Sequence, residues 1–369
     1  MTPREALISL NLIREIGFRR FKKLIASCDK PECIFSSSFE RLAVIPGIGE
    51  KIAKKIVSFP KKLLDSEIER AARMKLEIIT FVDPWYPESL KQIYDPPLVL
   101  YVKGVLGNDD GLRIAVVGSR RASLYGLTNA EKLSGDLSEH GVTVVSGLAR
   151  GIDTYAHRGA VKRGGRTIAV MGSGFDHLYP EENRELAEEI TRCSGAVITE
   201  FPIDTLPLRQ NFPLRNRIIS GLSQGVLVVE AARNSGALIT ADCALEQDRD
   251  VFALPGKIDS QTSSGTNGLI QQGAKLVCSA QDILQEYGWE EEVCEAPVSS
   301  LIRQNPEQAN ELSPDEERIF NLIGKEPCDF DQIILKSSLN ISRVSCILFA
   351  LQKKKLIQES YGKNFSIRK

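Results

Sequence analysis

The sequence lacks several signatures of catalytic and metal-binding proteins. Its 369 residues include only three histidines and eight cysteines, and the cysteines are scattered with no CxxC pair among them. The histidines do not cluster near the cysteines either. We therefore expect free thiols in a reducing cytosol, with no disulfide framework, no metal site and no catalytic centre.

Long apolar runs are also missing. No stretch approaches the roughly 18 apolar residues that a membrane helix needs, and the first twenty residues mix charges into their apolar positions, unlike a signal peptide. No G-x-x-x-x-G-K-[ST] motif is present, so an ATP-driven motor is not expected. The 42% hydrophobic and 26% charged residues are ordinary for a globular protein. These features predict a cytoplasmic protein of two or three domains, with no cofactor and no membrane contact.

The net charge of −1 conceals a strong asymmetry along the chain. Residues 1–62 carry a net charge of +7, residues 286–317 carry −9, and residues 318–369 carry +6. The remaining centre carries −5. Basic ends around a mildly acidic centre are compatible with nucleic-acid binding. If the centre binds phosphates, it must use a local group of residues rather than its overall charge.

Residues 1–62 are predicted to form a small helical domain. Within it, residues 44–56 place a Pro-Gly-x-Gly turn before apolar residues at helical spacing, which resembles a helix-hairpin-helix. Gly47 and Gly49 would let the backbone approach a phosphate near Lys51, making a secondary DNA contact. The alternative is a helical bundle in which the two glycines only form a tight turn.

From residue 113 the pattern changes to apolar strands that alternate with segments of helix length. Continuous apolar strands in this alternation are typical of a parallel sheet covered on both faces. We therefore predict an α/β fold, a Rossmann-type doubly wound and mostly parallel sheet, in a domain over 63–288 with a lead-in at 63–112. The predicted strands are 113–117, 142–145, 167–171, 196–199, 226–229 and 251–254.

The last eighty residues are predicted to contain a linker and a third domain. Residues 289–312 are acidic, include proline and serine, and have no periodicity, as in a linker. Residues 313–369 are predicted to form a winged helix, with helices at 314–325, 329–337 and 341–354 and a hairpin of 356–360 with 364–367. Helix 341–354 has few donors in its first half, so we expect a protein contact or weak phosphate contact there.

Glycines, small hydroxyl residues and arginines follow strand after strand in the central domain. In an open parallel sheet, ligands bind at the carboxyl ends of the strands. Arg120, Arg215 and Arg217 could hold backbone phosphates there, while Phe212 offers a stacking face to an unpaired base. The full predicted DNA-binding set is Gly118, Ser119, Arg120, Ser146, Gly147, Arg150, Gly172, Ser173, Gly174, Phe212, Arg215, Asn216, Arg217, Ser235, Gly236, Thr240, Gly265, Thr266 and Asn267.

A purely structural interpretation applies to each of these turns taken singly. Tight turns between strand and helix need glycine whatever they bind, and Asp153 and His157 suit capping or packing around the turn. The Gly118 turn is not a dinucleotide fingerprint, since G-x-G-x-x-G is absent, and the Gly172 turn lacks the third glycine. The case for DNA therefore depends on the turns together.

Six stretches in this order resemble the DprA/Smf family of bacterial DNA-processing proteins. They are residues 115–120, 146–153, 168–174, 212–220, 235–240 and 265–270. The resemblance implies an extended Rossmann fold, a homodimer, and binding of single-stranded DNA without catalysis. It also implies a role in natural transformation, in which incoming DNA is shielded from nucleases and handed to the recombinase RecA.

Two alternatives of other classes remain open at this point. The chain is also similar in fold class to lysine-decarboxylase-like nucleotide phosphoribohydrolases, with Glu230 as a general base, although their Pro-Gly-Gly-x-Gly-Thr loop is absent. The other alternative is a regulator that reads duplex DNA through the winged helix. Release of ribose 5-phosphate from AMP would identify the first, and a preference for duplex would identify the second.

Overall fold

A computed structural model describes residues 1–107, 111–289, 314–323, 328–337, 344, 347–348, 351–352, 354, 356–360 and 364–367. The chain divides into two compact units, Met1–Trp289 and Glu290–Lys369. Each unit is described separately below. The first contains the whole of the large sheet and the sequence motifs singled out above.

The first unit is built on a nine-stranded sheet in the order β1-β2-β6-β5-β4-β3-β7-β8-β9. The strands are β1 Glu77–Thr80, β2 Val99–Gly104, β3 Arg113–Val117, β4 Thr143–Ser146, β5 Thr167–Val170, β6 Ala196–Thr199, β7 Gly225–Val228, β8 Asp250–Ala253 and β9 Lys275–Leu276. Every neighbouring pair from β6 to β9 is parallel, and β2 runs antiparallel to both β1 and β6. The prediction of a doubly wound, mostly parallel sheet is confirmed.

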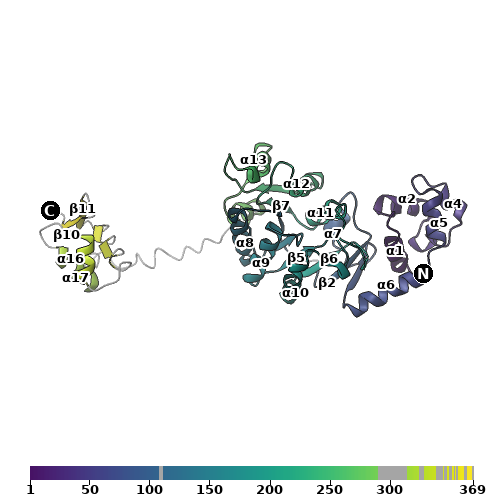
Figure 1. The fold of residues 1–369 in the computed structure, drawn as a ribbon, viewed down its shortest axis with the longest axis horizontal. Helices are drawn as coiled ribbons and strands as arrows, with labels where there is room; N and C mark the ends of the chain where they lie inside the picture. The colour runs from purple at the N-terminus through teal and green to yellow at the C-terminus, as the bar shows by residue number, and fades with distance from the viewer. Residues whose placement is uncertain are drawn as a thin grey trace. The chain divides into compact units, whose positions relative to one another are not determined.

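Helices cover both faces of this sheet. They are α7 Glu88–Lys91, α8 Leu124–Glu139, α9 Ile152–Lys162, α10 Arg184–Arg192, α11 Asn211–Gly221, α12 Gly236–Glu246, α13 Ser264–Gln271 and α14 Ala280–Leu284. One apolar core joins α8, α9 and α14 to one face, and another joins α7, α11, α12 and α13 to the opposite face. Figure 1 shows α12 and α13 on one side of the strands and α9 and α10 on the other.

The six strands predicted from the sequence are present, with ends that differ by at most a residue or so. Their four central residues are fully buried in most cases, which is why they appear as continuous apolar runs. The lead-in at 63–112 supplies β1 and β2, which the periodicity did not indicate. Short edge strands carry a weaker apolar signal than central ones, and β9 has only two residues.

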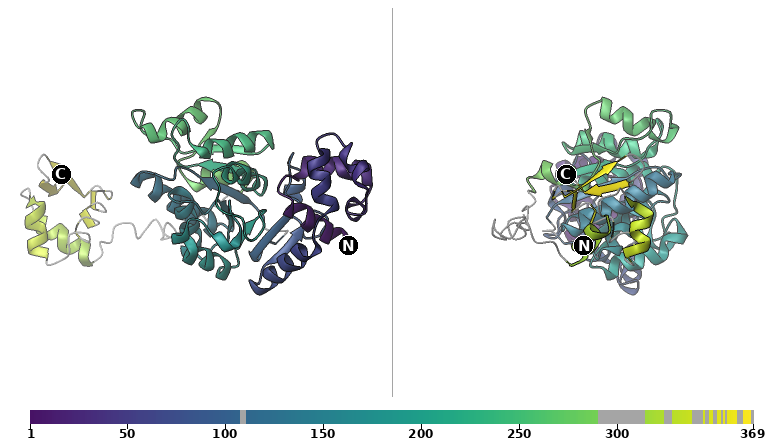
Figure 2. Two further views of the ribbon diagram at one scale, coloured as in Figure 1. Left: turned by 45° about the vertical axis from the view of Figure 1, so that its right-hand side comes forward. Right: turned by 90° about the vertical axis from the view of Figure 1, so that its left-hand side faces the viewer.

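Six helices precede the sheet along the chain: α1 Pro3–Leu12, α2 Phe18–Cys28, α3 Pro31–Ile34, α4 Phe39–Ala43, α5 Gly49–Val57 and α6 Lys61–Arg73. The first begins with a capping box, in which the Thr2 hydroxyl accepts a hydrogen bond from the amide of Glu5 and the Glu5 carboxylate accepts one from Thr2. Figure 2 shows these purple helices gathered at the end of the sheet where β1 and β2 lie.

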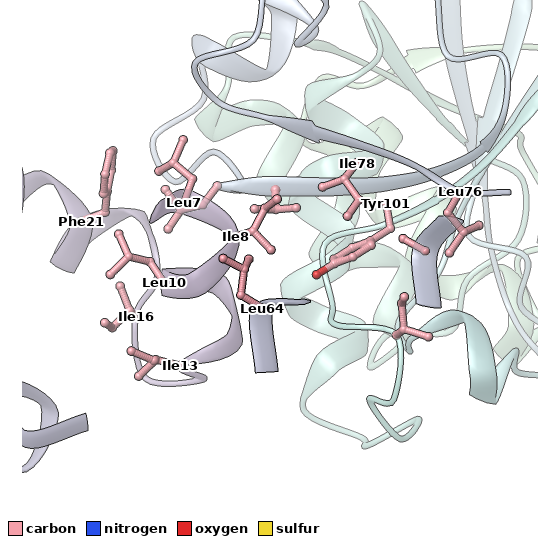
Figure 3. Close-up of a cluster of buried hydrophobic side chains, with 14 of the residues drawn as sticks. Leu7, Ile8, Leu10, Ile13, Ile16, Phe21, Leu64, Leu76, Ile78 and Tyr101 are labelled. Carbon is pink, nitrogen blue, oxygen red and sulfur yellow. The ribbon is translucent and has the colours of Figure 1, made fainter. Parts of the chain in front are cut away.

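The helical segment and the sheet share one apolar core. Leu7 and Leu10 of α1 and Leu64 of α6 pack in the same cluster as Ile78 of β1 and Tyr101 of β2, and Figure 3 shows these side chains close together. The expected division near residue 62 therefore separates two kinds of secondary structure within one packed unit. This packing fixes the N-terminal helices relative to the sheet edge.

The second unit contains α16 Pro314–Ile323, α17 Phe330–Ser337 and a three-stranded antiparallel sheet of β10 Cys328–Asp329, β11 Ile357–Ser360 and β12 Asn364–Ile367. The strands pair in the order β10-β12-β11. The predicted hairpin is confirmed, and β10 adds a strand that the sequence did not indicate. Most of the predicted linker and most of the predicted helix 341–354, including Ser342, Arg343 and Lys353, lie outside the described residues.

Candidate functional site

The order of the strands creates a topological switch point between β3 and β7. From β3 the chain adds β4, β5 and β6 on one side, then crosses through α11 to add β7, β8 and β9 on the other side. The loops that follow β3 and β7 therefore separate, and ligands of open α/β sheets bind in the crevice this leaves.

A cavity of about 600 Å³ lies at this point, and we call it the switch-point hollow. It is lined by Val117, Gly118, Ser119, Arg120, Arg121, Ala149, Asp153, Arg209, Phe212, Pro213, Arg215, Asn216, Ile219, Ser235, Gly236, Ala237, Ile239 and Thr240. The structure thus brings together predicted residues from the turn after β3, from α11 and from α12.

Two aromatic rings lie in a row between two arginine guanidinium groups, and the end of this row with Arg120 and Phe212 lines the hollow. The guanidinium carbon of Arg120 lies 4.6 Å from the centroid of the Phe212 ring. The Phe212 and Tyr179 ring centroids are 5.9 Å apart, and the guanidinium carbon of Arg150 lies 5.7 Å from that of Tyr179. Separations of this size are attractive for both cation–π and aromatic pairs. Together the four side chains form a surface with two aromatic rings in the middle and a positive charge at each end.

The position of Phe212 depends on Gly172. A Cβ atom at position 172 would lie 2.8 Å from Cδ1 of Phe212, so the ring rests directly on the backbone after β5. Any side chain there would move the ring away. The predicted importance of this turn therefore has a local explanation in packing, because Gly172 supports the stacking ring from below.

Arg150 is held in place by an ion pair. Its Nε and one terminal nitrogen donate to the two oxygens of Glu182 over 2.6 and 2.7 Å. The hydrogen bond from Arg150 lowers the pKa of the Glu182 carboxyl. Both side chains are exposed to solvent, so this bidentate pair is accessible to an incoming anion.

Arg215 forms the floor of the hollow and is only 3% exposed. Its guanidinium donates to the backbone carbonyls of Gly147 and Val170. Burial lowers its pKa to about 10, against the opposing effect of the Asp153 carboxylate, so it stays charged at neutral pH. Burial raises the pKa of Asp153, while Arg215 opposes this shift. Arg215 was predicted to grip a phosphate, and the structure commits one of its terminal nitrogens to two backbone carbonyls.

The structure places Arg217 away from the switch-point hollow. Its two terminal nitrogens donate to the Glu200 carboxylate over 2.6 and 2.7 Å, and its Nε donates to the backbone carbonyl of Asp95 over 2.8 Å. Residues two apart on a helix point in different directions, so Arg215 and Arg217 leave α11 on separate faces. The predicted joint grip by Arg120, Arg215 and Arg217 therefore does not occur in this geometry.

Several predicted turn residues are occupied with internal contacts. The Ser146 hydroxyl donates to the Val116 carbonyl over 2.6 Å, which ties β4 to β3. Ser173 is buried, and a Cβ on Gly174 would lie 2.2 Å from the Pro202 carbonyl oxygen. Gly147 lies against the Arg215 guanidinium, 2.2 Å from where its Cβ would be. Contacts within the fold account for Ser146, Gly147 and Gly174, whereas the buried Ser173 hydroxyl has no hydrogen-bond partner.

The turn at Gly265, Thr266 and Asn267 also serves the fold. The amide of Gly265 donates to the Ala231 carbonyl over 2.7 Å. The Asn267 side chain both accepts from the Gly256 amide and donates to its carbonyl, each over 3.1 Å. These bonds fix the turn after β8, which lines a different cavity from the switch-point hollow.

The N-terminal end of α12 faces the hollow. Ser235 caps this helix by accepting from the Ala237 amide over 3.3 Å, and the Asn216 side chain donates to the Gly236 carbonyl over 3.3 Å. Nothing occupies the space where a Cβ on Gly236 would project, while Thr240 is buried behind it. The partial positive charge of a helix N-terminus attracts anions at such a position.

Sequence reasoning missed three side chains at this site. Arg121 and Arg209 are exposed and line the hollow, and Tyr179 extends the aromatic row. Arg209 stands just ahead of α11 and could have been found from its closeness in sequence to Phe212. Tyr179 lies in an irregular loop with no periodic pattern, so nothing local indicated its role.

Glu230, the general base of the alternative hydrolase hypothesis, is used as a helix cap. One of its carboxylate oxygens accepts from the amide of Ser123 over 3.0 Å, and the other accepts from the Ser123 hydroxyl. Ser123 is the N-cap of α8. Since both oxygens have partners and the residue is 1% exposed, the carboxylate stabilises the start of α8.

His157 lies in the interior, as the packing interpretation predicted. Its Nδ1 is 2.7 Å from the Thr167 hydroxyl, and that hydroxyl donates to the Val144 carbonyl over 2.7 Å. The hydroxyl proton is therefore committed, so the imidazole must donate from Nδ1. Burial lowers the pKa of His157 to about 3, which keeps it neutral.

The hairpin of the N-terminal helices forms as expected between α4 and α5. Gly47 and Gly49 have φ of 88° and 63°, in the region that favours glycine. Lys51 is exposed on the first turn of α5.

In the described part of the chain, no group of three or more His, Cys, Asp or Glu side chains could hold a metal ion. Over the same residues, every helix is too short or too polar to span a bilayer.

Comparisons with known proteins agree with this geometry. Residues 77–288 match the family model described as DNA recombination-mediator protein A, and residues 303–358 match the DprA winged helix domain. The Smf protein of Escherichia coli K12 is 40% identical over 310 residues, which cover 83% of this chain and 81% of that protein. The family resemblance seen in the motifs is confirmed.

Two solved structures are similar over much of the first unit. The X-ray structure of DNA processing protein A from Streptococcus pneumoniae has a TM-score of 0.65 and 36% identity, covering 78% of this chain and 98% of that one. A Helicobacter pylori DNA processing protein A structure, described by its unique single-stranded DNA binding mode, has a TM-score of 0.51 and 28% identity. It covers 57% of this chain and 95% of that one.

Proposed function

The chain belongs to the DNA recombination-mediator protein A family, and from this premise we propose that it binds single-stranded DNA in the switch-point hollow. The observation that carries the proposal is the pairing of Arg120 with Phe212 at the mouth of the hollow. A cation beside a half-buried ring provides a phosphate contact and a base-stacking surface within one nucleotide's reach.

The charge of the hollow supports this proposal. Arg120, Arg121 and Arg209 are exposed and line it, and among the residues that line it the one carboxylate is Asp153. Asp153 is buried beside the charged Arg215. The exposed lining is therefore positive although the central part of the chain is acidic overall. Local positive potential of this kind attracts a polyanion and makes its binding salt-dependent.

Binding through these groups is sequence-tolerant. Phe212 and Tyr179 present faces on which any base can stack, and the arginines contact phosphates rather than base edges. Stacking on one ring contributes on the order of 1–3 kcal/mol. Each phosphate contact lowers log K by about 0.7 per unit of log salt concentration for a single strand.

The family membership supports the wider role as well. We propose that the protein acts in the cytoplasm as a homodimer, shields incoming single strands from nucleases during natural transformation, and loads RecA onto them for recombination. In this role it changes the fate of DNA by holding it, and we assign no catalytic residue. The engagement of Glu230 with Ser123 supports this over nucleotide hydrolysis.

The test is a binding titration with fluorescent single-stranded and duplex DNA of equal length at two salt concentrations. Wild type should prefer the single strand, and Arg120→Glu should lose this binding while keeping its thermal unfolding midpoint. Arg73→Glu makes the same charge change at an exposed position on α6, and it should bind like wild type.

Two results would contradict the proposal. A folded Arg120→Glu protein with unchanged affinity would remove the DNA site from the hollow. A preference for duplex that survives in this variant would instead support the winged-helix alternative. RecA loading is tested separately, by measuring RecA assembly on single strands coated with a competing single-strand-binding protein.

A further inference from the structure

A second basic cavity lies among the N-terminal helices, and we call it the α2 hollow. It has a volume of about 380 Å³ and is lined by Gly17, Arg19, Arg20, Lys23, Gly47 and Asp95. Three of these are cations on the first turns of α2. The sequence directed attention to Lys51 on α5, but the folded chain places the α2 cations against the glycine turn.

Contacts within the fold fix one of these cations and leave the others exposed. Arg20 donates from Nε to the Gly47 carbonyl over 2.9 Å and from a terminal nitrogen to the Glu15 carbonyl. Arg19 and Lys23 are exposed and, within the described residues, have no carboxylate at ion-pair distance. On α5, by contrast, Lys55 is paired with Glu15.

The glycine turn allows a close approach to Lys23. A Cβ atom at Gly47 would lie 3.2 Å from the Lys23 ammonium nitrogen, and the positive φ of Gly47 disfavours other residues. The backbone at Gly47 thus borders the cavity without a side chain to fill it. An anion in the cavity could contact the Lys23 ammonium beside this open stretch of backbone.

An aromatic ring stands at the rim of the α2 hollow. Tyr94 is 75% exposed, and the guanidinium carbon of Arg19 lies 4.6 Å from its ring centroid. This repeats the arrangement of Arg120 on Phe212. The fold does not bury this large ring. An unpaired base would stack on it.

A third cavity, which we call the middle hollow, adjoins the α2 hollow and lies across α11 from the switch-point hollow. It has a volume of about 250 Å³. It shares Gly17 and Asp95 with the α2 hollow, and it includes Asn211, Leu214 and Arg217 of α11. The opposite side of α11, with Phe212 and Asn216, lines the switch-point hollow. The middle hollow and the switch-point hollow share no lining residue, so α11 lies between them and a strand that uses both must cross this helix.

Arg217 neutralises two carboxylates that would otherwise repel a polyanion from the middle hollow. Both Asp95 and Glu200 line this cavity, and unpaired they would repel phosphates. Arg217 holds the Glu200 carboxylate in a bidentate pair, and its Nε lies 3.5 Å from the Asp95 carboxylate. Arg14, which is exposed, adds a further cation to the lining.

From these observations we infer that a single DNA strand leaving the switch-point hollow crosses the N-terminal end of α11 and is held a second time in the α2 hollow by Arg19 and Lys23. Tyr94 stacks on one of its bases there. This inference rests on the proposed function, because the first contact is the one at Arg120. It predicts that a strand long enough to reach both hollows binds more tightly than one that fills the switch-point hollow alone.

The test compares a short and a long oligonucleotide, of about 6 and about 20 nucleotides, on full-length wild type and on Arg19→Glu/Lys23→Glu. The variant should bind the long strand at least about 10-fold more weakly. Its log–log salt slope should fall by about 1.4, corresponding to two lost contacts. Binding of the short strand should change less than about twofold, because that strand fills only the first site.

Lys22→Glu/Lys30→Glu is the matched control. It makes the same charge change at exposed positions of the same region, outside the lining of the α2 hollow. It should leave both affinities within about twofold of wild type, the scatter expected of a purely long-range charge effect in moderate salt. Equal thermal midpoints for all variants confirm that folding is unaffected.

Three outcomes would overturn the inference. They are unchanged binding of the long strand by Arg19→Glu/Lys23→Glu, an equal loss for short and long strands, and an equal loss in the control. Failure of the proposed function has a different signature, because Arg120→Glu would then bind the short strand normally. The short strand thus reports on the switch-point hollow, and the difference between the two lengths reports on the α2 hollow.

Discussion

The guanidinium of Arg120 lies over the face of the Phe212 ring, with its central carbon 4.6 Å from the ring centroid. Arg120 belongs to the turn after β3, and Phe212 belongs to the first turn of α11. The pair forms only because α11 crosses the switch point between β3 and β7. The topology of the sheet therefore creates the stacking site.

Replacing Phe212 with alanine should weaken binding of single-stranded DNA. The lost stacking is worth on the order of 1–3 kcal/mol, which raises Kd by roughly 5- to 150-fold. Phe212→Tyr keeps the ring and should bind within about threefold of wild type, since only a hydroxyl is added. Fluorescence anisotropy at fixed salt measures both. Unchanged affinity in a folded Phe212→Ala protein would exclude stacking on this ring.

Arg217→Ala should destabilise the protein without changing how it binds a short strand. The change leaves Glu200 and Asp95 without their cation, at side chains that are 15% and 31% exposed. Breaking a largely buried pair costs about 3 kcal/mol of unfolding free energy. Denaturant titration measures this loss. If the variant instead kept its stability and lost affinity for a short strand, Arg217 would belong to the first DNA site.

Gly147→Ala should destabilise the first unit through Arg215. The new methyl group would lie 2.2 Å from a terminal nitrogen of the Arg215 guanidinium, so that group would have to give up its hydrogen bonds to the Gly147 and Val170 carbonyls. We expect a loss of about 3 kcal/mol in unfolding free energy, seen by denaturant titration. Gly236→Ala is the control, because its methyl group meets nothing within 4 Å, and its stability should change little.

Stability should fall between pH 7 and pH 5 because of His157. Burial lowers the pKa of His157 to about 3 from its ordinary 6.5, so the unfolded chain takes up a proton in this range and the native state does not. The contribution of His157 is present above pH 6.5 and is lost as pH falls. It amounts to about 2 kcal/mol between pH 7 and pH 5.

His157→Asn isolates this effect. Asparagine can keep the donor to Thr167 but cannot take up a proton, so the variant should lack about 2 kcal/mol of the wild-type loss between pH 7 and pH 5. Urea denaturation at several pH values gives the comparison. Parallel pH profiles for the two proteins would show that the imidazole is not kept neutral by the fold.

The sequence was sufficient to predict the sheet and the turn after β3. Central parallel strands are buried on both faces, so Arg113–Val117 appears as a continuous apolar run that ends at Gly118. The order of the strands was not predictable in this way. It depends on which helix crosses which face, and as a result Gly265 and Asn267 do not line the hollow that contains Arg120.

The arginines of α11 show why a site cannot be assembled from a motif alone. Arg215 and Arg217 are two residues apart in the motif but leave the helix on different faces, and each meets a carboxylate from a distant segment. Helical spacing would have separated them. Tyr179 and the α2 cations gave no such clue, because they join the aromatic row and the glycine turn only through tertiary packing.

In the free protein, the Glu182 carboxylate occupies the fork of the Arg150 guanidinium in which a phosphate could also bind. A phosphate that binds the same edge of the Arg150 guanidinium must displace this carboxylate, so the number of hydrogen bonds on that edge stays the same and little affinity is gained. The exchange instead selects anions by their shape. Only an anion that presents two oxygens in the fork of the arginine can complete the exchange, while chloride and other monatomic competitors leave the pair closed.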